Sequence, residues 1–301
     1  MSDLVSGLVP ILATPFAEDG ALDLASLRRL TEFQLGCGVA GLAVFGMASE
    51  GFALTAAERR TILATVTELV AGAVPVVAGV NATSLVTALE QAREAVDGGA
   101  DCLMVLPPYL AKPAPAQLVD FYGEVARASG CEVMVQDAPA ATGVAMSAAL
   151  LTELGKLRGV TSVKVEAQPT APKVAEVVAG APEGYAVIGG QNAFFLLEEL
   201  DAGAVGTMPA CEFSDLLGDV LAAYRRGDRS AAQTGYDRLL PLIRYGLQAG
   251  VAWAVHKEVL VRRGVIASAT VRMPARPLDT ATRRGLEPIL AALALPQWRG
   301  A

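Results

Sequence analysis

Eight short apolar runs of strand length recur along the 301-residue chain, and most of the intervals between them hold an amphipathic, helix-like segment. The runs are Leu8–Thr14, Gly41–Gly46, Val74–Val80, Cys102–Leu106, Glu132–Gln136, Thr161–Val165, Ala186–Gly189 and Ala204–Met208. Their near-continuous apolar character is typical of strands in a parallel sheet that helices cover. Eight such units in one chain favour an α/β fold of the (β/α)8 TIM-barrel type.

Helix-start signals support this reading of the chain. Thr55 is followed three residues later by Glu58, which is the spacing of a capping box, and Ser147 before Ala148 predicts a second N-cap. The competing fold is a doubly wound open sheet. The first strand, however, ends in Thr14-Pro15-Phe16 and lacks the glycine-rich phosphate turn of that fold.

The residues after the eighth run indicate further helices. We expect residues 1–212 to form the barrel. Residues 213–301 are predicted to supply its last helix and a C-terminal helical extension that belongs to the same structural unit.

Composition narrows the possible partners and the compartment. The formal net charge is −7 and no helix carries a cluster of lysines and arginines, which argues against nucleic acid. The longest uncharged stretch, Leu69–Leu89, is interrupted by Pro75 and Asn81, so no membrane helix is expected. Four scattered cysteines and the lack of a signal-peptide pattern predict a cytoplasmic protein.

Two residues of the sixth run carry the clearest chemical signal. Lys164 is a cation in an apolar strand, where burial without a counter-ion would favour the neutral amine that attacks a ketone to form an imine. Glu166 lies two residues further on and therefore points to the same side of the strand. The structural alternatives are a lysine that extends to solvent and a glutamate in an ordinary salt bridge.

Metal chemistry is not predicted. The only histidine is His256, which falls in the C-terminal helical region and is interpreted as a packed residue. Glycines 189, 190 and 206 could present backbone N–H groups to an anionic group after the seventh and eighth runs, although no lysine or arginine lies beside them in the sequence.

Several motifs together resemble the dihydrodipicolinate synthase and N-acetylneuraminate lyase family of class I aldolases, over about residues 7 to 295. The landmarks are Val9-Pro10 to Thr14-Pro15-Phe16, Gly46 to Glu50, Pro107-Pro108-Tyr109, Asp137-Ala138-Pro139, Lys164 and Gly189-Gly190. The resemblance implies a barrel, a Schiff base between Lys164 and a 2-oxo acid, and no metal or organic cofactor. It also implies a homo-oligomer, a tetramer or a dimer.

The same resemblance, with the strand-end positions, predicts the substrate contacts. Catalysis is assigned to Lys164, Glu166 and Gln136. The predicted substrate-binding residues are Ala48, Ser49, Glu50, Asp137, Gly190 and Thr207.

The chain departs from the synthase pattern at the residues that handle protons and the second substrate. Gln136 replaces the usual tyrosine, and Met47 and Leu110 stand where a threonine and a second tyrosine are usual. Ala141 replaces the arginine that grips the aldehyde substrate's carboxylate. These departures argue against dihydrodipicolinate synthesis.

A closer likeness is to the L-2-keto-3-deoxyarabonate dehydratase branch, through Ser49–Leu54, Gln136–Pro139 and Lys164–Glu166. The resemblance implies a lyase that dehydrates, or cleaves, a 2-keto-3-deoxy sugar acid: the imine acidifies C3, a base removes the proton, and water leaves from C4 or C5. One alternative is a 4-hydroxy-tetrahydrodipicolinate synthase or another pyruvate aldolase. A second is a non-catalytic protein that binds a 2-oxo acid.

Overall fold

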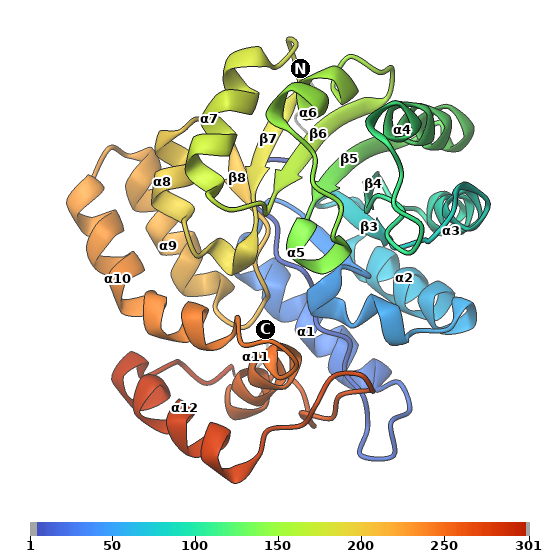
Figure 1. Ribbon diagram of the computed structural model, residues 1–301. Coiled ribbons are helices and arrows are strands. Elements are labelled where there is room, and N and C mark those ends of the chain that lie inside the picture. The colour runs from blue at the N-terminus through green and yellow to red at the C-terminus, as the bar shows by residue number, and fades with distance from the viewer. Residues whose placement is uncertain (1–4, 299–301) are drawn as a thin grey trace.

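The computed structural model describes residues 5–298 and shows a ring of parallel strands surrounded by helices (Figure 1). The strands are β1 (Gly7–Leu8), β2 (Leu42–Val44), β3 (Val76–Val80), β4 (Cys102–Val105), β5 (Glu132–Asp137), β6 (Val160–Val165), β7 (Ala186–Gly189) and β8 (Gly206–Thr207). From β2 to β8 each strand pairs with the next in chain order, and β1 pairs with β8. An isolated parallel bridge between Ile11, which follows β1, and Ala43 of β2 closes the ring. The predicted barrel is confirmed, and the open-sheet alternative is wrong.

Helices follow the strands, and apart from the short α5, which lies over the end of the ring, they cover its outside (Figure 1). They are α1 (Leu24–Gly36), α2 (Ala56–Val70), α3 (Leu85–Asp97), α4 (Pro115–Ser129), α5 (Pro139–Thr142), α6 (Ala148–Leu154), α7 (Thr170–Gly180) and α8 (Leu196–Asp201). Short 3-10 turns η1 (Met47–Ser49), η2 (Gly51–Ala53) and η3 (Gln191–Ala193) lie after β2 and β7. Thr55 and Glu58 form the predicted capping box, and Ser147 caps α6. Within residues 5–298, none of the helices combines the length and the apolar character that a membrane span requires.

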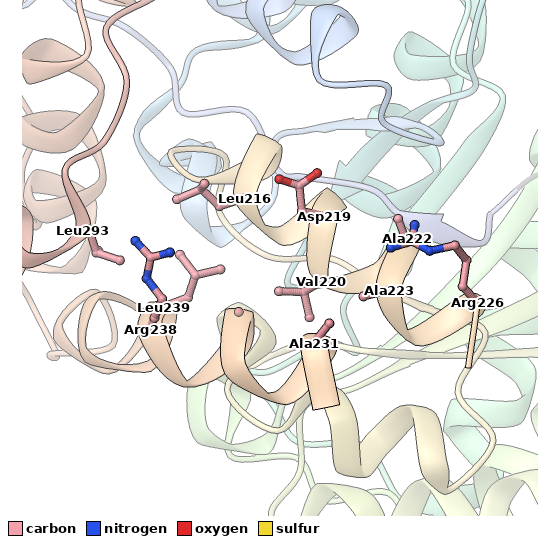
Figure 2. A pocket seen from close by; sticks show the side chains of 11 residues that line it. Leu216, Asp219, Val220, Ala222, Ala223, Arg226, Ala231, Arg238, Leu239 and Leu293 are labelled. Carbon is pink, nitrogen blue, oxygen red and sulfur yellow. The ribbon is translucent and has the colours of Figure 1, made fainter. Parts of the chain in front are cut away.

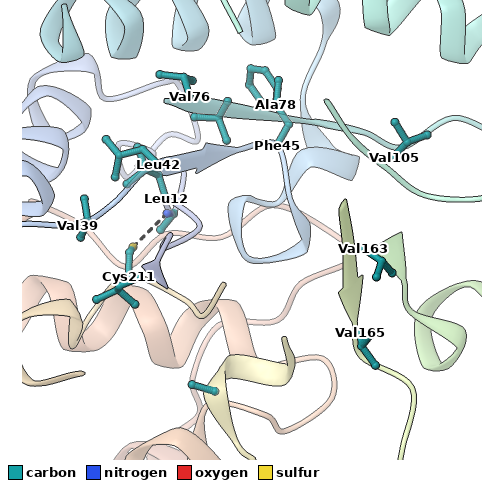
Figure 3. Packing of buried hydrophobic residues seen from close by; sticks show 14 of the residues in the cluster. Leu12, Val39, Leu42, Phe45, Val76, Ala78, Val105, Val163, Val165 and Cys211 are labelled. Carbon is teal, nitrogen blue, oxygen red and sulfur yellow. Dashed lines mark hydrogen bonds between the residues drawn. The ribbon is translucent and has the colours of Figure 1, made fainter. Parts of the chain in front are cut away.

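Two apolar layers meet the two faces of the strands. Outward side chains such as Val76, Val105 and Val163 pack against the helices (Figure 3). Inward side chains, among them Met104 and Met134, fill the ring with a smaller cluster. Because successive side chains on a strand alternate, membership of one layer fixes the direction of the neighbouring residues.

Four helices follow β8: α9 (Ser214–Arg225), α10 (Arg229–Tyr245), α11 (Ala252–Arg262) and α12 (Thr280–Leu293). The first packs against α10, which in turn contacts α12. Helix α11 reaches back to η1, at the carboxyl end of β2. The predicted division at residue 212 stays a prediction, and the outermost residues of the two predicted parts, 1–4 and 299–301, lie outside the described residues.

Candidate active site

Lys164 and Glu166 form a buried ion pair inside the carboxyl end of the barrel. The Nζ atom of Lys164 lies 3.2 Å from Oε1 of Glu166. The two residues are 1% and 8% exposed. Lys164 is therefore not buried without a counter-ion, and the salt bridge considered as the alternative for Glu166 is present. The expectation that both side chains share one side of the strand is confirmed.

Gln136 fixes the second oxygen of this glutamate. Its pairing position on β5 is directly opposite Lys164 on β6, and its Nε2 donates to Oε2 of Glu166 at 2.7 Å. The backbone N–H of Gln191 donates to Oε1 at 3.3 Å. The Oε1 atom of Gln136 is buried and has no hydrogen-bond partner within residues 5–298. The three predicted catalytic residues thus come together, with one amide oxygen left to accept a bond.

Gly189, the last residue of β7, and Gly190, which follows it, make room for two carboxyl groups. A Cβ atom on Gly190 would lie 2.9 Å from Cδ and 3.0 Å from Oε1 of Glu166. A Cβ atom on Gly189 would collide with the carboxyl group of Glu199, which comes from α8. Since alternate residues face opposite sides, Glu166 and Glu199 occupy opposite sides of the same strand end.

Glu199 was not predicted from the sequence. It is 1% exposed, and burial raises its pKa to about 7, with the charge of Glu166 acting in the same direction. Its neighbour in the sequence, Glu198, is exposed. Two consecutive glutamates in a short helix give no signal of which one is buried.

The turn η1 presents its backbone to the barrel interior. Ala48 packs against the inner apolar cluster. The carbonyl of Ser49 accepts a hydrogen bond from Oγ1 of Thr14 at 2.6 Å, and the Ser49 hydroxyl is buried without a partner among the described residues. The N–H groups of Met47 and Ala48 likewise find no acceptor in residues 5–298. This turn can therefore receive an anionic group.

Glu50 faces away from this interior. Its Oε1 lies 2.5 Å from Nζ of Lys257, and its Oε2 accepts the backbone N–H of Arg272 at 2.8 Å. Both oxygens are occupied and the side chain is fully buried, so the predicted contact of Glu50 with substrate stays a prediction that its side-chain geometry does not favour. The glutamate binds the C-terminal helices instead.

Two other predicted contacts also point outward. Asp137 pairs with Nζ of Lys173 on α7 at 2.6 Å, and burial raises the pKa of this carboxyl although the lysine opposes the shift. Thr207 precedes Met208, which belongs to the inner cluster, so alternation turns Thr207 toward the helices. The sequence placed both residues at strand ends correctly but on the wrong face.

Hollows occur at separate places in the described part of the chain. One, of about 190 Å³, opens over the ends of β2 to β5 and is lined by Met47, Phe52, Asn81, Tyr109 and Ala141 among others, none of them charged. Another, of about 370 Å³, lies between α9 and α10 and includes Asp219, Arg226 and Arg238 (Figure 2). None of the predicted catalytic or substrate-binding residues lines either hollow, although Met47 of the first hollow belongs to η1 together with Ala48 and Ser49.

The remaining titratable candidates do not gather into a metal-ligand set. No cluster of three or more histidine, cysteine, aspartate and glutamate side chains with that geometry occurs in the described part of the chain. His256 is buried, and its Nδ1 lies 2.7 Å from Oε1 of Glu212. The interpretation of His256 as a packed residue is confirmed.

A closed parallel barrel with polar side chains buried at its carboxyl end is the organisation of a (β/α)8-barrel enzyme. The model of the dihydrodipicolinate synthetase family matches residues 4–293. The chain belongs to this family, and it is a lyase of the family.

Named relatives and solved structures agree with this assignment. The chain is 36% identical to L-2-keto-3-deoxyarabonate dehydratase of Azospirillum brasilense, over 93% of this chain and 92% of that protein. It is 30% identical to 4-hydroxy-tetrahydrodipicolinate synthase of Methylococcus capsulatus, over 87% and 91%. The crystal structure of dihydrodipicolinate synthase from Rhodopseudomonas palustris superposes with a TM-score of 0.91 at 28% identity, covering 97% of this chain and 99% of that one. YagE of E. coli K12, solved in complex with pyruvate, gives 0.89 at 26% identity, over 97% and 99%.

Proposed function

We propose that the protein is a class I dehydratase of a 2-keto-3-deoxy sugar acid, such as L-2-keto-3-deoxyarabonate, and that it works through an imine on Lys164. The observation that carries the proposal is the buried group of Lys164, Glu166 and Gln136, which combines an amine with a carboxylate 3.2 Å away. The relative named as a dehydratase of that acid supports the substrate class.

The first step makes the imine. A proton passes from the Lys164 ammonium to the Glu166 carboxylate, which frees the nitrogen lone pair for attack on the C2 carbonyl. Loss of the C2 oxygen as water leaves a protonated imine. The carboxylate of the 2-oxo acid binds at η1, to the N–H groups of Met47 and Ala48 and the Ser49 hydroxyl. Gly190 contributes by leaving space for Glu166.

The second stage removes water from the sugar chain. The imine withdraws electrons from C3, so Glu166 can remove a C3 proton, and the resulting electron pair expels the C4 hydroxyl as water. Protons from C5 and its hydroxyl then move to C3 and C4, which turns C5 into an aldehyde. Hydrolysis of the imine releases 2-oxoglutarate semialdehyde and restores Lys164.

The hollow beside η1 supports a substrate whose end distant from the 2-oxo acid carboxylate carries hydroxyl groups and no charge. Its polar groups are Asn81, Tyr109 and Thr142, and no arginine or lysine of residues 5–298 lines it. A second carboxylate there would have no cationic partner, which disfavours the synthase reaction although relatives carry that name.

Three further properties belong to the same proposal. The imine itself is the electron sink, so the reaction needs no metal ion and no organic cofactor. The free thiols of all four cysteines support a cytoplasmic location. Membership of the family supports a homo-oligomer, a dimer or a tetramer.

Product analysis separates the candidate reactions. The protein is incubated with L-2-keto-3-deoxyarabonate and the products are identified by mass spectrometry. The proposal expects 2-oxoglutarate semialdehyde. Pyruvate with a two-carbon aldehyde as the main products would contradict dehydration and favour an aldolase, whereas a bound but unconverted substrate would favour a binding protein.

A further inference from the structure

The turn η1 is held by a residue 206 positions away. The indole Nε1 of Trp253, in the first turn of α11, donates to the carbonyl of Met47 at 2.5 Å. The same carbonyl accepts the N–H of Glu50 at 3.0 Å. The indole ring also packs edge-on against Phe52, with 5.2 Å between ring centroids. The contact with Phe52 therefore fixes the position of the indole ring, and the hydrogen bond to Met47 fixes its orientation.

The Met47 carbonyl and the Ala48 N–H belong to one peptide group. Hydrogen bonds to the carbonyl oxygen polarise that group and strengthen its N–H as a donor. They also fix the plane of the peptide, and with it the direction of the Ala48 N–H. This N–H has no acceptor within residues 5–298, so its donor capacity is available to a ligand.

One helical turn further along α11, Lys257 holds the other end of the same turn. Its Nζ lies 2.5 Å from Oε1 of Glu50, and residues four apart lie on one face of a helix. Glu50 adopts a left-handed conformation with φ of 55°, which ends η1. One face of α11 therefore contacts both ends of η1, through Trp253 at Met47 and through Lys257 at Glu50.

We infer that Trp253 is a positioning residue for the carboxylate of the 2-oxo acid, acting through the Met47–Ala48 peptide. The inference rests on the proposed function, since it takes η1 as the site of that carboxylate. It makes the C-terminal extension part of substrate recognition. Trp253 itself does not touch the reacting atoms.

The first test compares Trp253→Phe with Trp298→Phe, a matched change at the other tryptophan. Pyruvate affinity is measured by calorimetry, and the rate of borohydride labelling is measured with pyruvate and with hydroxyacetone, a ketone that lacks the carboxylate. Without the Trp253 hydrogen bond the Ala48 N–H is no longer held toward the carboxylate, and the weakening of that bond to a charged group is expected to raise the pyruvate dissociation constant about fivefold or more. Labelling by hydroxyacetone, and both measurements on Trp298→Phe, should change less than about twofold.

A second protein removes the N–H without changing the ring shape. The chain has two tryptophans, so Trp298→Phe protein made with β-(3-benzothienyl)alanine in place of tryptophan carries sulfur for N–H at position 253 alone. It should show the same loss of pyruvate affinity. Unchanged pyruvate affinity in both proteins, or equal losses with hydroxyacetone, would overturn the inference. A wild-type protein that binds pyruvate but converts no sugar acid would instead overturn the dehydratase assignment and leave this comparison valid. If the wild-type protein binds no pyruvate, both the proposed function and the inference about Trp253 are wrong.

Discussion

Nζ of Lys164 and Oε1 of Glu166 lie 3.2 Å apart in a nearly solvent-free part of the barrel. Each charge compensates the burial of the other, because an unpaired charge in such a place carries a large desolvation penalty. The same closeness allows a proton to pass between the two groups. One pair thus serves both the stability of the strand end and the proposed chemistry.

Glu166→Gln keeps the shape of the side chain and removes the base. We expect dehydration to fall about 100-fold or more, because proton transfer by a positioned group contributes roughly that much or more. Imine formation with pyruvate should become slower but still occur, since the Lys164 amine remains and loses only its proton acceptor. Steady-state kinetics and borohydride labelling measure the two effects, with the exposed neighbour variant Glu198→Gln as control. Full dehydratase activity in Glu166→Gln would refute the role as base.

Gly190→Ala tests whether activity requires the space that Gly190 leaves for the Glu166 carboxyl group. The new methyl group would lie within 3.0 Å of the carboxyl atoms and displace them, and a misplacement of about 1 Å can reduce activity about 100-fold. Gly123→Ala is the matched control, because its methyl group meets Leu157 only at 3.9 Å. Equal kcat/KM values for the two variants would contradict the claim that activity depends on this position of the Glu166 carboxyl group.

Lys257→Met should destabilise the fold by about 3–5 kcal/mol, because it leaves the Glu50 carboxylate buried and unpaired. The double variant with Glu50→Gln should recover part of that loss. Urea denaturation at pH 7 gives the free energies of unfolding. Arg60→Met, which breaks an exposed pair with Glu94, serves as control and should cost less than about 1 kcal/mol. A similarly small effect for Lys257→Met would mean that the buried pair is not required.

The pKa of Glu199, raised by burial to about 7, predicts a pH-dependent stability. Between its ordinary pKa of 4.5 and about 7 the folded protein keeps the proton that the unfolded chain releases. The free energy of unfolding should therefore decrease as pH rises through this window, by roughly 2–3 kcal/mol. Glu199→Gln removes this contribution, so its stability relative to wild type should be higher at pH 8 than at pH 5. Glu198→Gln should show no such difference. Parallel pH profiles of wild type and Glu199→Gln would contradict the prediction.

Local sequence patterns predicted the barrel well. Strand-length apolar runs, capping residues and the spacing of Lys164 and Glu166 all depend on contacts between near neighbours in the chain. The period of two along a strand was enough to place Glu166 beside Lys164.

The errors share a physical cause. At Asp137 and Thr207 the strand end was identified, but a shift of one residue reverses the face, and only the packed layers settle it. The ion pair of Glu50 was not predicted because its partner, Lys257, is 207 residues away and becomes its neighbour only when α11 folds back. The positions of Trp253 and Glu199 depend on tertiary packing in the same way.

Borohydride reduction in the presence of pyruvate tests the central claim most directly. The account predicts a stable mass increase on the peptide that contains Lys164, matching one reduced pyruvate adduct, and no labelling of a Lys164→Met variant that remains folded. No adduct on Lys164 across pyruvate and a panel of 2-keto-3-deoxy acids, or equal labelling of the variant at another lysine, would contradict it.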